Sequence, residues 1–193
     1  MRKTKCISYL KFAVILCCAA TLSSCTIVFK TSLPKSLKTR QDPRLFGKWV
    51  GQDDQGHRAF VECVRTQGQT KISFTTQDSS SSYLGYRNPI FRMVTTNINS
   101  RNYMILRYVD VSKARGFQIA KYEIDSDKLT IWILDLEKIK QAVKEGKLKG
   151  EIGTGMLPGV EITDGWAKIN ALLKSPNSDD FFVRVGEITK VTL

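Results

Sequence analysis

The amino-acid sequence predicts a mainly β domain, with eight antiparallel strands and two short helices before the last strand. Three observations support this. Short runs rich in β-branched and aromatic residues recur from residue 45 onward, turn-forming Gly, Asn, Asp and Ser separate them, and two segments with helical apolar spacing precede the last run. The predicted strands cover residues 45–50, 58–65, 71–76, 91–98, 103–109, 117–124, 129–134 and 181–191.

Alternation is clearest in the seventh strand, where Leu129, Ile131 and Ile133 share one face. The link Asp125-Ser-Asp127 joins this strand to the preceding one as a predicted hairpin. A meander is the simplest topology for eight strands connected in this way.

The first helix is predicted between Asp135, which can cap its start, and Gly146, which can end it. The second is expected over residues 164–174, since Trp166, Ile169, Leu172 and Leu173 have helical spacing. Residues 150–159 contain four glycines, and we expect a loop there.

Residues 1–24 have the layout of a secretory leader, with four basic residues, no acid and an apolar run over residues 12–22. As a helix this run would rise about 16 Å, which is too short for a ~30 Å hydrocarbon core. It is followed by Leu22-Ser-Ser-Cys25, which resembles the lipobox of bacterial lipoprotein precursors. An ordinary cleaved leader with a free thiol at Cys25 is the alternative.

The lipoprotein resemblance implies a diacylglyceryl group on the Cys25 sulfur, cleavage before Cys25, and acylation of the new amine, for example with palmitate. We therefore expect an exported protein whose partner is the membrane that holds its lipid anchor. Thr26 stands where inner-membrane lipoproteins of enteric bacteria carry Asp, so the resemblance implies an outer-membrane location facing the periplasm.

Removing the leader takes away four basic residues and no acid, so the net charge falls from +12 to +8. Three of the five cysteines leave with it, and with Cys25 lipidated only Cys63 remains, which excludes an internal disulfide. Export, and the lack of a basic run interleaved with stacking aromatics, argue against nucleic acid as a partner.

Residues 25–44 are predicted to form a basic tether, because Pro34 and Pro43 interrupt any periodic pattern. Two interpretations of this tether stay open: its cations contact anionic lipid headgroups, or the segment is only a soluble linker. The cations are Lys30, Lys35, Lys38, Arg40 and Arg44.

Residues 45–193 form the predicted main domain, and its first strand contains Gly47-Lys-Trp49, which resembles the Gly-x-Trp opening of lipocalins. That resemblance implies a lipocalin-like eight-stranded barrel closed at one end by Trp49. It also implies that Arg184, on the last strand, packs over the Trp49 ring.

The mature chain is also similar to uncharacterised bacterial lipocalin-like lipoproteins. The shared segments are Gly47-Lys-Trp49, Ala120-Lys-Tyr-Glu-Ile124, Leu134-Asp135 and Gly146-Lys-Leu-Lys-Gly150. This resemblance supports the fold and implies no activity.

The sequence favours a protein that is not an enzyme and has no cofactor or metal. His57 and Cys63 would lie roughly 20 Å apart along one extended strand, too far for a catalytic dyad. Cys63 is expected to be a buried apolar residue. The acid pairs Asp53-Asp54 and Asp179-Asp180 lack the spacing of a calcium loop and are expected in turns. The sequence does not decide whether an acid/base pair, such as Glu62 with Glu123, forms across the barrel.

Two functions remain. The first is a membrane-tethered carrier of a small apolar or amphipathic molecule, and the second is a non-catalytic envelope module that binds protein or glycan. For a carrier, we expect the site at the open end of the barrel, beside residues 79–89 and 150–159, with Tyr83 and Tyr86 in contact with the ligand. The alternative places both tyrosines against the barrel rim.

Overall fold

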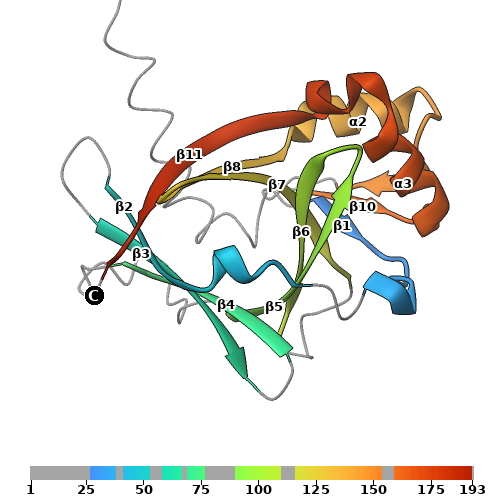
Figure 1. Ribbon diagram of the computed structural model, residues 1–193. Helices are drawn as coiled ribbons and strands as arrows, with labels where there is room; N and C mark the ends of the chain where they lie inside the picture. The colour runs from blue at the N-terminus through green and yellow to red at the C-terminus, as the bar shows by residue number, and fades with distance from the viewer. Residues whose placement is uncertain are drawn as a thin grey trace, which may run out of the picture.

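The structure is a computed structural model that describes residues 27–37, 41–52, 58–66, 69–76, 90–109, 116–153 and 159–192. Eight antiparallel strands close into a barrel in the order β11-β2-β3-β4-β5-β6-β7-β8 (Figure 1). Their bounds are Gly47–Gln52 (β2), Arg58–Thr66 (β3), Gln69–Thr76 (β4), Ile90–Ile98 (β5), Arg101–Tyr108 (β6), Gln118–Asp125 (β7), Lys128–Leu134 (β8) and Phe182–Lys190 (β11). The mainly β, lipocalin-like barrel that the sequence predicts is confirmed.

Burial alternates along the barrel strands between an inner and an outer face. On β6, Met104 and Leu106 belong to the inner cluster of apolar residues, whereas Tyr103 and Ile105 belong to a second cluster outside the barrel. All four side chains are buried. The outer face of the barrel at β6 is therefore covered by another layer.

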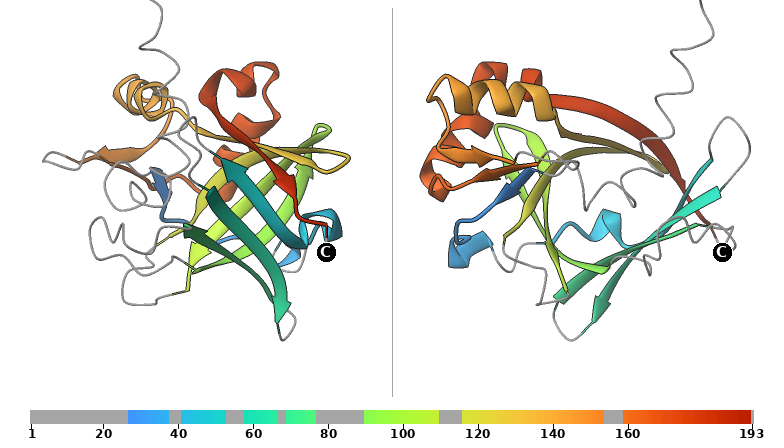
Figure 2. Two further views of the ribbon diagram at one scale, coloured as in Figure 1. Left: turned by 90° about the vertical axis from the view of Figure 1, so that its left-hand side faces the viewer. Right: turned by 180° about the vertical axis from the view of Figure 1, so that it is seen from behind.

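That layer combines two helices with a three-stranded sheet in the order β1-β10-β9. Its strands are Ile27–Phe29 (β1), Val160–Ile162 (β10) and Gly150–Ile152 (β9). Figures 1 and 2 show the sheet together with α2 (Leu136–Lys144) and α3 (Trp166–Lys174) on one side of the barrel. Short 3₁₀ segments complete the described chain: Lys35–Leu37 (η1), Pro43–Leu45 (η2) and Pro176–Phe181 (η3).

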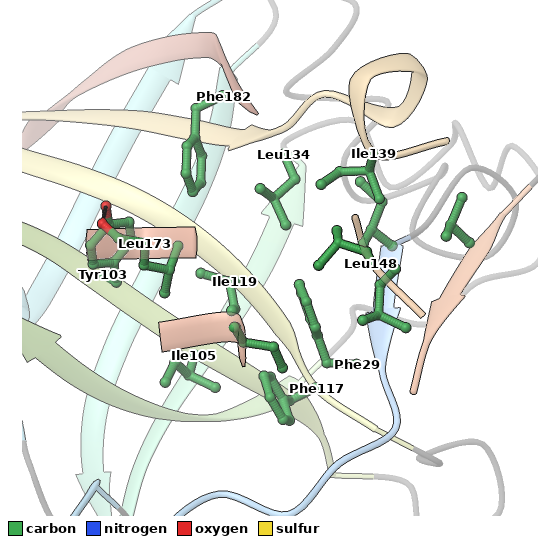
Figure 3. Packing of buried hydrophobic residues seen from close by; sticks show 14 of the residues in the cluster. Phe29, Tyr103, Ile105, Phe117, Ile119, Leu134, Ile139, Leu148, Leu173 and Phe182 are labelled. Carbon is green, nitrogen blue, oxygen red and sulfur yellow. Dashed lines mark hydrogen bonds between the residues drawn. The ribbon is translucent and has the colours of Figure 1, made fainter. Parts of the chain in front are cut away.

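The predicted tether over residues 25–44 is wrong for Ile27–Phe29, which pairs in parallel with β10. Phe29 is 1% exposed, and its ring stacks on Phe117 with 5.3 Å between ring centroids (Figure 3). Burying a side chain of this size contributes about 1.5–3 kcal/mol. The basic residues of the segment do not prevent this, because Lys30 extends outward to Glu161, 2.9 Å away.

Gly116 makes the close approach of β1 to the barrel geometrically possible. A Cβ atom at this position would lie 2.5 Å from the Phe29 carbonyl oxygen. Next to it, Phe29 and Phe117 exchange two backbone hydrogen bonds of 2.9 and 3.1 Å. Glycine is therefore required where the two layers meet.

The predicted first helix is confirmed in α2. Asp135 caps it, with the carboxylate accepting hydrogen bonds from the backbone N–H groups of Glu137 (3.0 Å) and Lys138 (3.2 Å). Ile139 is fully buried and Gly146 lies just past the helix end.

The second helix, α3, begins two residues later than predicted, after the extended Gly165, and the Asp164 carboxylate accepts a 2.6 Å hydrogen bond from the backbone N–H of Lys149. Residues 150–159 are not all loop: β9 and β10 form an antiparallel pair at the two ends of this segment, where Gly150 lies opposite Ile162.

Candidate functional site: the barrel interior

The inner face of the barrel is lined mainly by apolar side chains from all eight strands, with Leu45 of η2 added at one end. The buried members of this inner cluster are Leu45, Trp49, Val61, Cys63, Ile72, Phe91, Met93, Met104, Leu106, Ala120, Tyr122, Leu129 and Ile188. An interior of this composition can hold an apolar ligand or be filled by its own side chains, depending on how they pack at each end.

Trp49 fills the end of the barrel where β2 and β11 pair. Its ring is 1% exposed, as predicted, and its indole N–H donates a 2.9 Å hydrogen bond to the Leu45 carbonyl. Gly47 begins β2 with a φ of 120°, a backbone conformation that other residues rarely adopt. The Lys190 N–H bonds the Asp127 carbonyl at 2.7 Å, so the β7–β8 turn lies at this same end.

The cation over the Trp49 ring is Lys190, not Arg184 as the lipocalin resemblance implies. Lys190 is the cross-strand partner of Trp49, and its ammonium lies 5.3 Å from the ring centroid. Arg184 points to the opposite face of β11, where its guanidinium pairs with Glu187 at 3.1 Å.

A β-bulge explains this difference. Strict alternation from Ile188 through Gly186 would place Arg184 on the inner face, but the register of β11 against β8 shifts between Arg184 and Gly186. The extra residue, Val185, reverses the alternation beyond it, so that Arg184 faces outward and Val183 faces inward. A bulge of this kind leaves no clear signal in the sequence.

A polar cluster beside η2 was not predicted from the sequence. The Asp42 carboxylate accepts a 2.8 Å hydrogen bond from the hydroxyl of Tyr122, a residue on the inner face of β7. The same carboxylate forms an ion pair with the Arg44 guanidinium, 2.7 Å away. Burial favours a higher pKa for Asp42, but the hydrogen bonds from Arg44 and Tyr122 outweigh it and lower the pKa. The pKa of Tyr122 is raised, first by burial of its hydroxyl and then by its hydrogen bond to the Asp42 carboxylate. This cluster attaches η2 to the barrel interior near Trp49.

Cys63 lies midway along the inner face, opposite Ile72 of β4, and is 2% exposed. Burial raises the pKa of its thiol to about 12, so the group is a neutral thiol at neutral pH. It is the buried apolar residue that the sequence predicts. His57 lies outside the described residues.

Along β8 and β11, the inner face is more exposed to solvent at the end opposite Trp49. Val183 and Ile133 are cross-strand partners there. Val183 is 39% exposed, and Ile133 and Ile131 are half-buried, whereas Leu129 and Ile188 near Trp49 are 1% and 3% exposed. Burial of apolar side chains therefore falls along the inner face of β8 and β11, whereas Phe91 of β5, on the inner face and away from Trp49, is 1% exposed.

Three predicted site residues, Cys25, Tyr83 and Tyr86, lie outside the described part of the chain. Strand β4 ends at Thr76 and β5 begins at Ile90, at the end of the barrel away from Trp49. The predicted rim segment 79–89 connects these two ends. The predicted rim segment 150–159 instead contributes β9, which belongs to the outer layer.

The acid/base pair that the sequence left open, Glu62 with Glu123, does not meet inside the barrel. Glu62 lies opposite Lys48, and Glu123 follows the inward Tyr122, so both carboxylates are on the outer face. Among the described residues, no group of three or more His, Cys, Asp or Glu side chains is placed to hold a metal ion.

Asp179 takes part in an ion-pair network on the outside of the barrel that the sequence did not reveal. Lys121, only 8% exposed, contacts the Asp179 carboxylate at 2.8 Å, and Arg101 contacts the same carboxylate at 2.9 Å. The hydrogen bond from Lys121 lowers the pKa of Asp179. The Lys121 ammonium also lies 4.4 Å from the centroid of the Trp132 ring. This network ties η3 to β6 and β7.

Comparison with known proteins finds no matching family model, no similar curated protein and no similar solved structure. None of the described helices has the length and apolar composition that a membrane-spanning helix needs.

Proposed function

We propose that this protein is an exported lipoprotein, anchored through Cys25 to the periplasmic face of the outer membrane, that binds a small apolar or amphipathic molecule in its barrel. The observation that carries the binding proposal is the fall in burial along the inner face of β8 and β11, from Leu129 and Ile188 beside Trp49 to Val183. On these two strands the side chains beside Trp49 are fully buried, and the apolar side chains at the opposite end are partly exposed to solvent.

The exposed inner end is suited to an apolar ligand. Leaving apolar side chains such as Val183 and Ile133 in water costs about 25 cal/mol per Å² of apolar surface. A ligand that covers them recovers this free energy, and the buried Trp49 end supplies a rigid floor.

We propose binding and not catalysis. The Cys63 thiol, with a pKa raised to about 12, is a poor nucleophile at neutral pH. Its location on the inner face, between Val61 and Ile72, is that of an apolar packing residue.

Titration of a hydrophobic fluorescent probe into the mature chain, together with native mass spectrometry for co-purified lipid, tests the binding proposal. Val183→Asp places a charge on the exposed inner end. Val64→Asp is the matched control, since Val64 is 41% exposed, close to the 39% of Val183, but faces outward from β3. We expect saturable binding that weakens tenfold or more in Val183→Asp and is unchanged in Val64→Asp. Equal effects of the two substitutions, or no saturable binding, would contradict a barrel site and favour a surface interaction module.

Membrane fractionation tests the anchor. Cys25→Ser removes the sulfur that would carry the diacylglyceryl group, so we expect the protein to lose the mobility shift of a lipoprotein and its processing before residue 25. A density gradient of membranes from cells that make the unchanged chain should place it with the outer membrane. An unchanged mature mass and unchanged processing in Cys25→Ser would refute lipidation at this residue.

A further inference from the structure

Three cations form a row across the outer face of the barrel, on β4, β5 and β6. Lys71 lies directly opposite Arg92, and Arg92 lies directly opposite Arg107. All three precede or follow inward residues, so their side chains leave the barrel on the same side. Because neighbouring strands are about 4.8 Å apart, the row is about 10 Å long.

This arrangement is unfavourable for the isolated fold, because like charges directly opposite one another repel. None of the three cations forms an ion pair with another described residue. The nearest acid on this face by register, Glu62, lies opposite Lys48. Elsewhere on the outer surface, Lys121, Arg101 and Lys128 do meet carboxylates. Among the described residues, the row therefore lacks the carboxylate partners that Lys121, Arg101 and Lys128 have.

Exposed apolar side chains border the row. Val64, the cross-strand partner of Lys71, is 41% exposed, and Ile90, two positions before Arg92, is 44% exposed. Both belong to the outer face. Cations flanked by exposed aliphatic groups match the chemistry of a phospholipid headgroup region, which presents phosphates above the start of the acyl chains.

The Arg107 end of the row lies on the side of the barrel where β1 attaches. Strand β1 begins at Ile27, two positions after Cys25, so at most about 7 Å of extended chain joins Cys25 to the folded domain. Phe29 of β1 bonds to Phe117, and the next residue, Gln118, pairs with Leu106, the neighbour of Arg107. A domain tethered this closely cannot move far from the bilayer or rotate freely beside it.

We propose that the row Lys71–Arg92–Arg107 binds the headgroups of anionic phospholipids and holds the barrel wall β4–β6 against the membrane that carries the Cys25 lipid. The lipid at Cys25 keeps the domain at the membrane, and the row determines which side of the barrel faces the membrane. This proposal rests on the proposed function, since lipidation of Cys25 brings the domain to the membrane. The affinity of the row for an anionic surface belongs to the described residues and is measured without the lipid.

The test uses residues 25–193 carrying Cys25→Ser, which retain every residue that the structure describes. Sedimentation with vesicles of phosphatidylcholine containing about one third phosphatidylglycerol is compared with pure phosphatidylcholine vesicles at low salt. The test variant is Lys71→Gln/Arg92→Gln/Arg107→Gln. The matched control, Lys144→Gln/Lys168→Gln/Lys174→Gln, removes the same charge from exposed positions on α2 and α3.

We expect binding that depends on the anionic lipid and weakens as salt is added. Each cation near such a surface contributes about fivefold in partition, so the row variant should bind up to about 100-fold more weakly and the control several-fold at most. Circular dichroism of both variants confirms folding. Equal losses in the two variants would show only a response to net charge, and binding to both kinds of vesicle would show an apolar contact; either result overturns the proposal.

A second readout separates this proposal from the anchor itself. In the lipidated full chain, a fluorophore at Ile90→Cys should be quenched by headgroup-labelled lipid, whereas one at Lys174→Cys should not. Quenching at both positions or at neither would overturn the proposed orientation. Lipidation of Cys25 is tested separately, by the Cys25→Ser experiment.

Discussion

At the scale of single residues, the end of the barrel that holds Trp49 is the part of the interior most completely fixed by contacts. Leu45 accepts a hydrogen bond from the indole, Lys190 covers the ring, and Tyr122 reaches Asp42 beside it. These residues come from η2, β2, β7 and β11, so this end depends on segments distant in the chain.

Replacing Trp49 by alanine should cost about 3–5 kcal/mol in the free energy of unfolding, because the ring is buried. Lys190→Ala should cost about 1 kcal/mol through loss of the cation–π contact, and Arg184→Ala, an exposed position, less than about 0.5 kcal/mol. Urea denaturation followed by tryptophan fluorescence and circular dichroism measures all three. A larger loss for Arg184→Ala than for Lys190→Ala would contradict the bulge at Val185.

The stabilising effect of Asp42 should depend on pH. Its folded-state pKa lies below the ordinary value, so its contribution is fully present above the unfolded pKa of about 3.9 and is lost as pH falls through the lower folded value. Asp42→Asn should therefore destabilise the protein at pH 7, with a difference from the parent that shrinks below about pH 4. Denaturation at pH 7, 5 and 3 checks this, and a difference that grows on acidification would exclude it.

At the scale of secondary-structure elements, β1 is a buried strand where the sequence predicts a tether. A segment of basic and proline-containing sequence contributes Ile27 and Phe29 to a buried layer outside the barrel. The layer also takes in α2 and α3, and it lets β6 and β7 bury both of their faces. The folded domain therefore starts two residues after Cys25 rather than twenty.

Gly116→Ala should weaken the attachment of β1. Its Cβ would lie 2.5 Å from both the Phe29 carbonyl oxygen and the Val28 side chain, so the backbone must shift, at a cost of about 1–3 kcal/mol. Gly153→Ala is the control, since its Cβ would meet only ordinary contacts at 3.4 Å or more, and should change stability by less than about 0.5 kcal/mol. Faster amide exchange at Phe29 and Phe117 should accompany the first change.

At the scale of the whole molecule, the inner and outer apolar clusters share the strands β6 and β7 as a common wall. Met104 packs into the barrel, and its neighbour Ile105 packs into the outer layer. Loss of either cluster leaves one face of the shared strands in water. The barrel and the outer layer should therefore unfold together.

Met104→Ala and Ile105→Ala should each cost about 2–5 kcal/mol and should each lower the midpoint of one cooperative transition. Fluorescence of single-tryptophan variants separates the two layers, because Trp49 reports the barrel interior and Trp166 the outer layer. Coincident curves for both probes are expected in both variants. Separate transitions would show that the outer layer is an independent unit.

The sequence by itself determined the elements of the barrel. Runs of β-branched and aromatic residues divided by turn-forming residues place the eight strands, and Asp135 and Gly146 mark the ends of α2 because caps are local interactions. The lipocalin resemblance of Gly47-Lys-Trp49 implied the burial of Trp49, and the general preference of free cysteine for buried positions predicted that of Cys63. Cys25, Tyr83 and Tyr86 remain predictions from the sequence.

Only the tertiary structure decided which distant groups meet. Three residues are too few for a periodic signal, so β1 is defined by its pairing with Val160–Ile162, more than 130 residues away. The bulge at Val185 determines that Lys190, and not Arg184, covers Trp49, because one extra residue reverses every side chain beyond it. The row of Lys71, Arg92 and Arg107 likewise exists only through strand register, which depends on the packing of both faces of the sheet.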